Sequence, residues 1–416
     1  MGRQLLPVAA LLMGAMFLFM ANGVAMLLLP IRGGLEEFLP SHIGLIGTGW
    51  AAGFITGCLT VPWLVQRVGH VRTFGVMAAT ASISMLLNLL LIDPWAWIAL
   101  RALSGFSFAG AMMIMESWLN ERASNESRGT VFAVYMTINL GASTIGQMLI
   151  AAGDPGGFVF FVLAAILFCM ALVPTALSTA AAPKPLVSTR IRLGPLYANS
   201  PVAVVGCFSI GMANGAFGTM GAVYGQKIGL SVVAIVLLTA TAIMGGAVAQ
   251  LPLGRMSDRT DRRLVITGTS LVAAAMGTAF FALDPRDAPL VIGMAAVFGV
   301  FAYPLYGLCV AHANDFADPE RFVEISSGLI LVYGFGTMVG PLASAGMMEW
   351  IAPRALFAFT AVVHLWIASY ALYRRMRRAP VPVDQRGAYG PMPLPRATTP
   401  QTAAIDPRAD REAKAG

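Results

Sequence analysis

Two ionisable residues lie inside an apolar stretch that is long enough to cross a membrane. Arg101 and Glu116 both fall in the run from about residue 95 to residue 118. A charge within a membrane span costs at least about 2.5 kcal/mol on insertion scales, so it usually faces the interior of a helix bundle or a water-filled cavity. This run is therefore the first place where the chain could bind a polar group or move a proton.

Arg101 and Glu116 lie on nearly the same face of the predicted helix. Successive intervals of four, three, four and three residues lead from Arg101 through Gly105 to Met115. Residues at these intervals lie on one face of a helix. Arg101 has two readings: it gates a polar pathway, or it caps carbonyl groups of a neighbouring helix. Fifteen residues separate it from Glu116, about 22 Å along the axis, so the two cannot form an ion pair.

The composition shows that such runs make up most of the chain. Hydrophobic residues are 57% of the 416 residues and charged residues 11%, whereas a soluble domain usually carries about 25% charged residues. A span needs about 20 apolar residues, and the first run is too long for a signal peptide. The runs lie at about 5–30, 42–65, 73–92, 95–118, 129–152, 158–178, 201–226, 230–253, 264–283, 290–313, 325–348 and 355–373. They predict an all-α membrane protein of about twelve transmembrane helices.

The positive charges predict the orientation. If the N-terminus is cytoplasmic, 22 of the 27 Lys and Arg residues fall in cytoplasmic segments, and four fall in outer loops: Arg32, Lys227, Arg286 and Arg354. This positive-inside bias predicts that both termini are cytoplasmic. Arg outnumbers Lys 24 to 3, which is typical of a GC-rich bacterial genome, so we expect a multi-pass protein of a bacterial inner membrane. The net charge of +7 reflects the same bias, so we expect no nucleic-acid partner. The bilayer itself is the expected surrounding.

Pro-rich and polar stretches divide the chain. A Pro-rich stretch separates the first six runs from the last six, and the composition turns polar after Tyr373. We expect an N-terminal six-helix half (1–178), a cytoplasmic linker (179–200), a C-terminal six-helix half (201–373) and a tail (374–416). The tail is rich in Pro and Ala and is predicted to be disordered.

Weak repeats at matching places indicate that the two halves are related. Arg67 follows the second run, and Arg259 follows the eighth. The loops after the fourth and tenth runs both lead into Gly-rich helices, with Gly146 in one half and Gly340 in the other.

These motifs resemble the major facilitator superfamily. The family's cytoplasmic motif between its second and third helices is matched in the C-terminal half by Gly254, Asp258, Arg259, Arg262 and Arg263, with Asp261 in place of the second Gly. The N-terminal copy keeps Arg67 and Gly69, but Gln66 stands where Asp is usual.

Further segments extend the resemblance. Arg101-Ala-Leu-Ser-Gly105 is similar to a motif of the family's fourth helix, and the pair Glu121 and Arg128 is similar to its cytoplasmic Glu/Arg pair. The strings Glu116-Ser-Trp-Leu-Asn and Tyr333-Gly-Phe-Gly resemble the YcaD-like branch, whose bacterial members have no assigned substrates. The resemblance implies two pseudo-symmetric six-helix bundles (the major facilitator fold) and transport.

The charged residues of these motifs are candidates for coupling or gating. Glu116 either carries a coupling proton or anchors Arg67 or Arg72 of a neighbouring loop. Loop pairs that contribute about 0–1 kcal/mol each suit a gate that must open and close. The candidates are Arg101, Glu116, Glu121, Arg128, Arg67, Asp258, Arg259, Arg262 and Arg263.

The resemblance also implies that helices one, four, seven and ten surround a central pathway. Their polar and aromatic residues are the substrate-cavity candidates: Asn22, Met112, Asn214, Phe217, Tyr303, Tyr306 and His312. They offer hydrogen bonds and aromatic surface but little charge, which favours a small, neutral or amphipathic organic solute.

Other kinds of chemistry are not indicated. The sequence has no Gly-x-x-x-x-Gly-Lys-Ser/Thr phosphate-binding loop, no catalytic constellation, and no metal-ligand spacing among its four cysteines. We expect no enzyme activity, no cofactor and no metal, a small-molecule substrate, a proton or other coupling ion, and a monomer. The leading hypothesis is a secondary transporter working by alternating access. The alternative is a membrane sensor or assembly factor on a transporter fold.

Overall fold

The computed structural model describes residues 8–123, 127–176, 192–318, 321–392 and 398–406. Within these ranges the regular structure is helical, with no strand. The first half contains α2 (Ala9–Leu35), α3 (Pro40–Val68), α4 (His70–Leu90), α5 (Pro94–Arg122), α6 (Arg128–Leu149) and α7 (Val159–Ala176). The second half contains α9 (Pro201–Lys227), α10 (Val232–Arg259), α11 (Arg262–Leu283), α12 (Ala288–Ala302), α13 (Leu305–Asn314), α14 (Phe322–Trp350) and α15 (Ala355–Arg377).

These helices fill the twelve predicted positions. Within the described ranges, ten helices are long and apolar enough to cross a membrane, if α12 and α13 are counted as one span that is interrupted at Tyr303 and Pro304. The two further positions are taken by α7, which is apolar but short, and α6, which carries polar residues along one side. The prediction of an all-α membrane fold is confirmed.

Several helices begin at a residue whose side chain caps the first turn. The Asp93 carboxylate accepts from the backbone N–H of Ala96 at 2.8 Å at the start of α5. Ser200, Ser231, Asp261 and Asp287 cap α9, α10, α11 and α12 in the same way. These caps satisfy N–H groups that have no partner within the helix, so the chain can turn sharply between spans.

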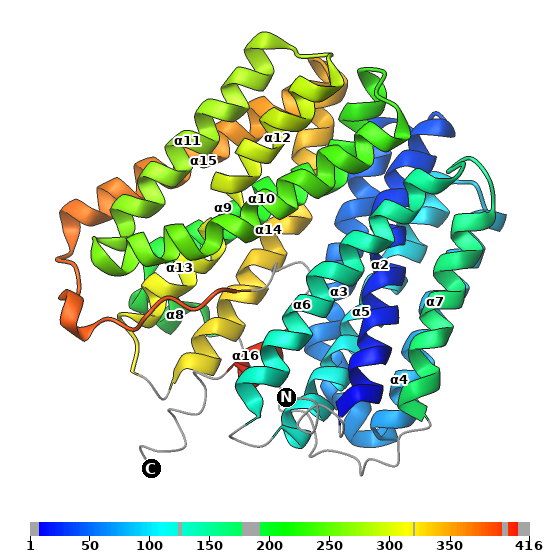
Figure 1. Cartoon of the computed structure of the whole chain (residues 1–416), viewed down its shortest axis with the longest axis horizontal. Coiled ribbons are helices and arrows are strands. Elements are labelled where there is room, and N and C mark those ends of the chain that lie inside the picture. Colours follow the sequence, from blue (N-terminus) through cyan, green and yellow to red (C-terminus); the bar gives the residue numbers. More distant parts are fainter. Residues whose placement is uncertain (1–7, 124–126, 177–191, 319–320, 393–397, 407–416) are drawn as a thin grey trace.

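The two halves repeat one packing pattern. In the first half α2 packs on α6, α3 on α5 and α4 on α7, and in the second half α9 packs on α14, α10 on α12 and α11 on α15. Each pair occupies the same place in the helix order of its half. The fold is therefore two pseudo-symmetric six-helix bundles, which lie side by side in Figure 1.

Glycines allow equivalent helix pairs to approach closely. A Cβ at Gly146 of α6 would overlap the carbonyl oxygen of Met20 in α2, and a Cβ at Gly340 of α14 would overlap that of Met212 in α9. The absence of a side chain lets the two backbones touch, as in other membrane helix pairs. The Gly-rich helices that the sequence placed in corresponding positions therefore make corresponding contacts.

The two halves contact each other most closely at one end. We call the end that carries the loops after Arg67 and Arg259 the basic end, and the other the opposite end. At the opposite end, the Gln226 amide donates to the carbonyl of Ile31 at 2.8 Å, and the backbone N–H of Ser41 donates to Glu349 at 3.2 Å. Toward the basic end the bundles diverge (Figure 1).

The linker and tail differ in part from the expectation. Most of the predicted linker, residues 179–191, lies outside the described residues, and Leu193–Asn199 form the short helix α8. Described residues of the tail predicted to be disordered pack against the body, and residues 402–405 form α16 (Thr402–Ile405). Composition misjudged the described part of this segment because several of its polar groups find partners on the two halves.

The glycine contacts lead to a stability prediction with a control on each helix. We expect Gly146→Ala and Gly340→Ala each to destabilise the fold by about 1–3 kcal/mol, because the added methyl forces two backbones apart. At Gly141 of α6 and Gly346 of α14, a Cβ would meet no atom within 4 Å. Gly141→Ala and Gly346→Ala should therefore leave the melting temperature of the purified protein unchanged or slightly higher. Equal melting temperatures for all four variants would contradict the close-approach account.

Candidate functional site

A cavity lies between the two halves. It is lined from α2 and α6 on one side and from α9, α10, α14 and the end of α12 on the other. Its volume is about 100 Å³. Its polar and aromatic lining residues are Asn22, Asn139, Ser143, Thr144, Gln147, Thr239, Phe217, Tyr303 and Tyr333. No charged side chain is among the lining residues in the described part of the chain.

Three of the predicted cavity residues line this space, namely Asn22, Phe217 and Tyr303. Four do not. Met112 and Asn214 are buried in helix packing, Tyr306 packs its ring at 5.3 Å from the ring of Tyr333, and His312 packs at 5.1 Å from Phe316. Met112 is excluded because α5 does not contribute to this cavity.

The sequence reading missed the contribution of α6. Asn139, Ser143 and Gln147 follow one another at intervals of four and therefore lie on one face of the helix. Across the cavity, the Thr239 hydroxyl of α10 lies 3.4 Å from the Gln147 amide oxygen, to which it donates. A polar stripe at helical spacing in an otherwise apolar run was the signal that would have found these residues.

Arg101 lies behind the cavity wall in the N-terminal half. The side chain is 3% exposed, its Nη2 donates to the sulfur of Met26 at 3.2 Å, and its guanidinium lies 5.8 Å from the ring centre of Trp50. Met26 lines the cavity. Arg101 is thus separated from the cavity by one side chain.

Glu116 is fully buried near the basic end of α5. Its carboxylate accepts hydrogen bonds from the Tyr135 hydroxyl of α6 at 2.9 Å, from the Thr402 hydroxyl at 2.6 Å, and from the Thr399 hydroxyl. The two threonines belong to the C-terminal tail. The described partners of Glu116 are therefore hydroxyl groups and not the arginines that the sequence suggested.

Arg262 is the centre of a charged cluster at the basic end. Its side chain is 2% exposed and forms ion pairs with Asp315 at 2.6 Å and with Asp258 at 2.9 Å. It also donates to the Ser257 hydroxyl at 2.8 Å and to the carbonyl of Gly387 in the tail at 2.6 Å. Burial raises the pKa of Asp315, and the ion pair with Arg262 only partly offsets this effect. The guanidinium is satisfied by three different parts of the chain.

Arg263 ties the same loop to the end of α15. It forms a two-pronged ion pair with Asp261, at 2.9 and 3.0 Å, and donates to the carbonyl of Arg378 at 2.7 Å. Burial alone would raise the pKa of Asp261, but the hydrogen bonds from Arg263 outweigh it and hold the pKa below its ordinary value. The loop after α10 is therefore fixed to the tail on two sides.

The remaining gating candidates lie at the surface of the basic end. Arg67 is exposed and stacks at 4.1 Å over the ring of Trp63, and Arg259 is exposed on the last turn of α10. Glu121 is exposed near the end of α5, and Arg128 is half-buried at the start of α6. In the described part of the chain, no group of three His, Cys, Asp or Glu residues is arranged to hold a metal ion.

Sequence comparison identifies relatives along nearly the whole chain. The family model of the Major Facilitator Superfamily matches residues 11–283 and residues 203–407. The chain is also 24% identical over 383 residues to the uncharacterized MFS-type transporter YcaD of Escherichia fergusonii, a match that covers 91% of this chain and 98% of that protein.

Solved structures with the same fold include two transporters. The nucleoside transporter NupG superposes with a TM-score of 0.72 at 12% identity, over 89% of this chain and 98% of NupG. A bacterial homolog of the human lysosomal transporter Spinster, in an inward-facing and occupied conformation, gives a TM-score of 0.72 at 13% identity, over 92% and 98% of the chains. With two matched halves, a cavity between them and a family model that matches each half, this chain belongs to the major facilitator superfamily of membrane transporters.

Proposed function

We propose that this protein is a secondary active transporter that moves a small neutral or amphipathic organic solute by alternating access. The observation that carries the proposal is the cavity between the halves, whose described lining offers amide, hydroxyl and aromatic groups without a fixed charge. Amides and hydroxyls can both donate and accept hydrogen bonds, so they suit an uncharged polar cargo. A highly charged anion would need more fixed cations than this lining provides.

The contacts between the halves support alternating access. At the opposite end the halves are joined by separate hydrogen bonds such as those of Gln226 and Ser41. A single hydrogen bond contributes about 0.5–1.5 kcal/mol net, so these contacts can break and re-form as the halves rock about the cavity. We take residues 1–178 and 201–373 as the two moving units.

The charge bias supports an orientation for this cycle. The basic end carries Arg67, Arg72 and Arg259, and the positive-inside rule assigns such loops to the cytoplasm. In a bacterial inner membrane, the opposite end would then face outward. The described conformation, closed at the opposite end, would be inward-facing, which is also the conformation of the Spinster homolog.

A proton is the coupling ion that we propose. Glu116 is a buried carboxylate at the basic end, and the Tyr135 hydroxyl is hydrogen-bonded to it. Arg101 lies one side chain behind the cavity wall near the opposite end. Glu116 is a group that can bind and release a proton, and Arg101 is a permanent positive charge on the same helix.

The cavity assignment is tested with two threonines of α10. Both hydroxyls donate to carbonyls of their own helix, Thr239 to Val236 and Thr241 to Leu237, but only Thr239 of the two lines the cavity. In proteoliposomes with an imposed proton gradient, the wild-type protein is screened against a pool of neutral metabolites to find an accumulated solute. We expect Thr239→Val to lower uptake of that solute several-fold, because it removes a cavity hydroxyl, and Thr241→Val to leave uptake unchanged.

The same screen separates transport from the alternative function. A sensor or assembly factor would accumulate no solute, with or without the gradient. Equal loss of uptake in Thr239→Val and Thr241→Val would show that the cavity is not the binding site.

The Arg101 prediction uses flux and stability together. If Arg101 holds Met26 and the cavity wall in a functional position, Arg101→Ala should abolish uptake. Membrane abundance should stay near normal, because removal of the charge also removes an insertion cost of at least about 2.5 kcal/mol. A parallel fall in abundance and melting temperature would instead identify a structural role. Wild-type uptake and stability would contradict both readings.

The orientation is tested by labelling of introduced cysteines in intact cells. Arg286 is exposed in the loop between α11 and α12, and Val71 is exposed at the start of α4. Arg286→Cys should react with a membrane-impermeant maleimide, and Val71→Cys should react only after the membrane is permeabilised. The reverse pattern would overturn the orientation.

A further inference from the structure

The C-terminal segment turns back from the end of α15 and crosses the basic end of the molecule. After α15 the chain runs along the C-terminal half and reaches α16, which lies between the two bundles (Figure 1). We call residues 386–392 and 398–405 the return segment. It makes contacts of two kinds.

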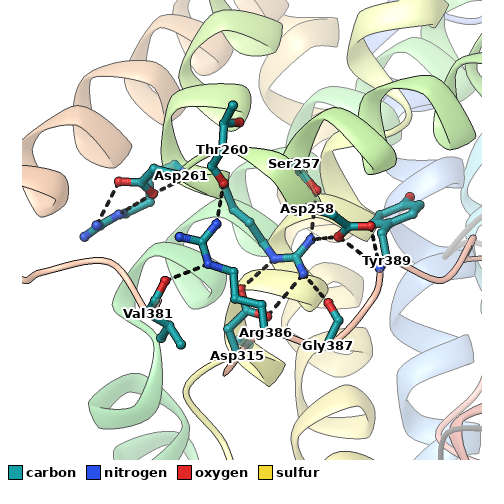
Figure 2. Close-up of polar contacts among 12 residues, drawn as sticks. Ser257, Asp258, Thr260, Asp261, Asp315, Val381, Arg386, Gly387 and Tyr389 are labelled. Carbon is teal, nitrogen blue, oxygen red and sulfur yellow. Dashed lines mark hydrogen bonds and ion pairs between the residues drawn. The ribbon is translucent and has the colours of Figure 1, made fainter. Parts of the chain in front are cut away.

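The first part of the return segment is fixed along one face of α10. Arg386 donates to the carbonyl of Thr260, the backbone N–H of Tyr389 donates to the Asp258 carboxylate at 3.0 and 3.1 Å, and the backbone N–H of Met392 donates to the Gln250 amide oxygen at 3.0 Å. Figure 2 shows the first two of these contacts beside the carbonyl of Gly387. The segment therefore follows α10 from its basic end toward the cavity.

Two glycines provide the space for the Tyr389 ring. A Cβ at Gly254 of α10 would overlap the ring carbons of Tyr389, and a Cβ at Gly307 of α13 would overlap its hydroxyl oxygen. Gly254 lies between Gln250 and Asp258 at intervals of four, so all three share one helix face. This face of α10 therefore accommodates a chain whose aromatic side chain lies against Gly254.

The second part of the return segment joins the halves. The Thr399 and Thr402 hydroxyls donate to Glu116 of the N-terminal half, and the Ser327 hydroxyl of α14 donates to the carbonyl of Pro400 at 3.0 Å. Ile405 is fully buried in the hydrophobic core that is formed mainly by the N-terminal half. The segment is thus bonded to both moving units at the end where they diverge.

The return segment also borders the route from the cavity to the basic end. A second cavity has a volume of about 330 Å³. It is lined by α6, by Ala247 and Gln250 of α10, and by Pro391 and Met392 of the segment. Asn139 and Leu140 line both this cavity and the central one. In the transport cycle proposed above, on which this step rests, a solute that leaves the central cavity toward the basic end passes between these walls.

We propose that the basic-end mouth of the pathway is a binding site for a peptide, and that the return segment of this chain occupies it as an autoinhibitory plug. The site is built from the α10 face around Gly254 and from the Glu116 carboxylate, and it recognises an aromatic residue followed by two hydroxyl-bearing residues. While the segment is bound, the mouth is covered and the halves are tied together. Release of the segment opens the mouth.

The plug is tested by accessibility, which needs no cargo and no flux. Ala247→Cys places a thiol in the second cavity without removing a hydrogen bond to the segment. In detergent-solubilised protein, a membrane-impermeant maleimide should label this cysteine several-fold faster when residues 379–416 are deleted. Val71→Cys, exposed at the basic end on α4, should be labelled at the same rate in both lengths of chain.

A second test adds the segment as a separate peptide. A synthetic peptide of residues 386–406 should slow labelling of Ala247→Cys in the shortened chain, and the same peptide with valine at positions 399 and 402 should not. In the full chain, Thr399→Val combined with Thr402→Val should raise the labelling rate, whereas Thr241→Val should not.

Two outcomes would overturn the proposal. One is equal labelling of Ala247→Cys in full and shortened chains that melt at the same temperature. The other is an unchanged labelling rate of Ala247→Cys in the full chain that also carries Thr399→Val and Thr402→Val. This second outcome decides the question if the shortened chain does not fold. Because no transport is measured, either outcome leaves the proposed transport function standing, and a failure to find a cargo leaves the plug standing.

Discussion

The structure depends on how closely its helices approach within each half. In a bilayer every backbone polar group must be satisfied inside its own segment or by a neighbour, so spans are helical. Association between such helices then rests on van der Waals packing and close backbone contact. The contacts of Gly146 with Met20 and of Gly340 with Met212 provide this at equivalent places. Each half is consequently a tightly packed unit, and the surface between the two halves is a separate interface.

That surface is held differently at its two ends. At the opposite end the halves bond directly, through residues such as Gln226 and Ser41. At the basic end a third element, the return segment, bonds to Glu116 on one side and to Asp258 on the other. Both acidic residues were candidates for coupling or gating, and both bond to the tail; Asp258 also keeps its ion pair with Arg262. Their role at the basic end therefore cannot be described without the C-terminal segment.

The sequence predicts the membrane spans well and the cavity only in part. Hydropathy and the Lys/Arg bias depend on local composition, and each predicted run corresponds to a helix or, between Ala288 and Asn314, to a helix pair. Which residues face the cavity depends on helix tilt and rotation, which a single sequence does not fix. Phe217 and Tyr303 were therefore found, Met112 was misplaced, and the polar stripe of α6 was overlooked although its spacing was visible.

The described part of the tail, residues 374–392 and 398–406, departs most from the prediction, and the cause is physical. Its own composition offers too few apolar residues for a core, which is why it was predicted to be disordered. Its order comes from partners elsewhere: the glycine face of α10, the Glu116 carboxylate and the Ser327 hydroxyl. Non-local partners of this kind leave no periodic signal in the segment that they hold.

The short helix α13 lies between a residue of the cavity wall and a residue of the charged cluster. Tyr303 lines the cavity at one end of α13, and Asp315, at the other end, is clamped by Arg262. A ten-residue helix is a stiff rod of about 15 Å. The backbone keeps helical dihedral angles through Tyr303 and Pro304, so α13 continues the course of α12. The cavity wall and the charged cluster are therefore parts of one nearly continuous helix, and the position of Tyr303 depends on how Arg262 holds Asp315.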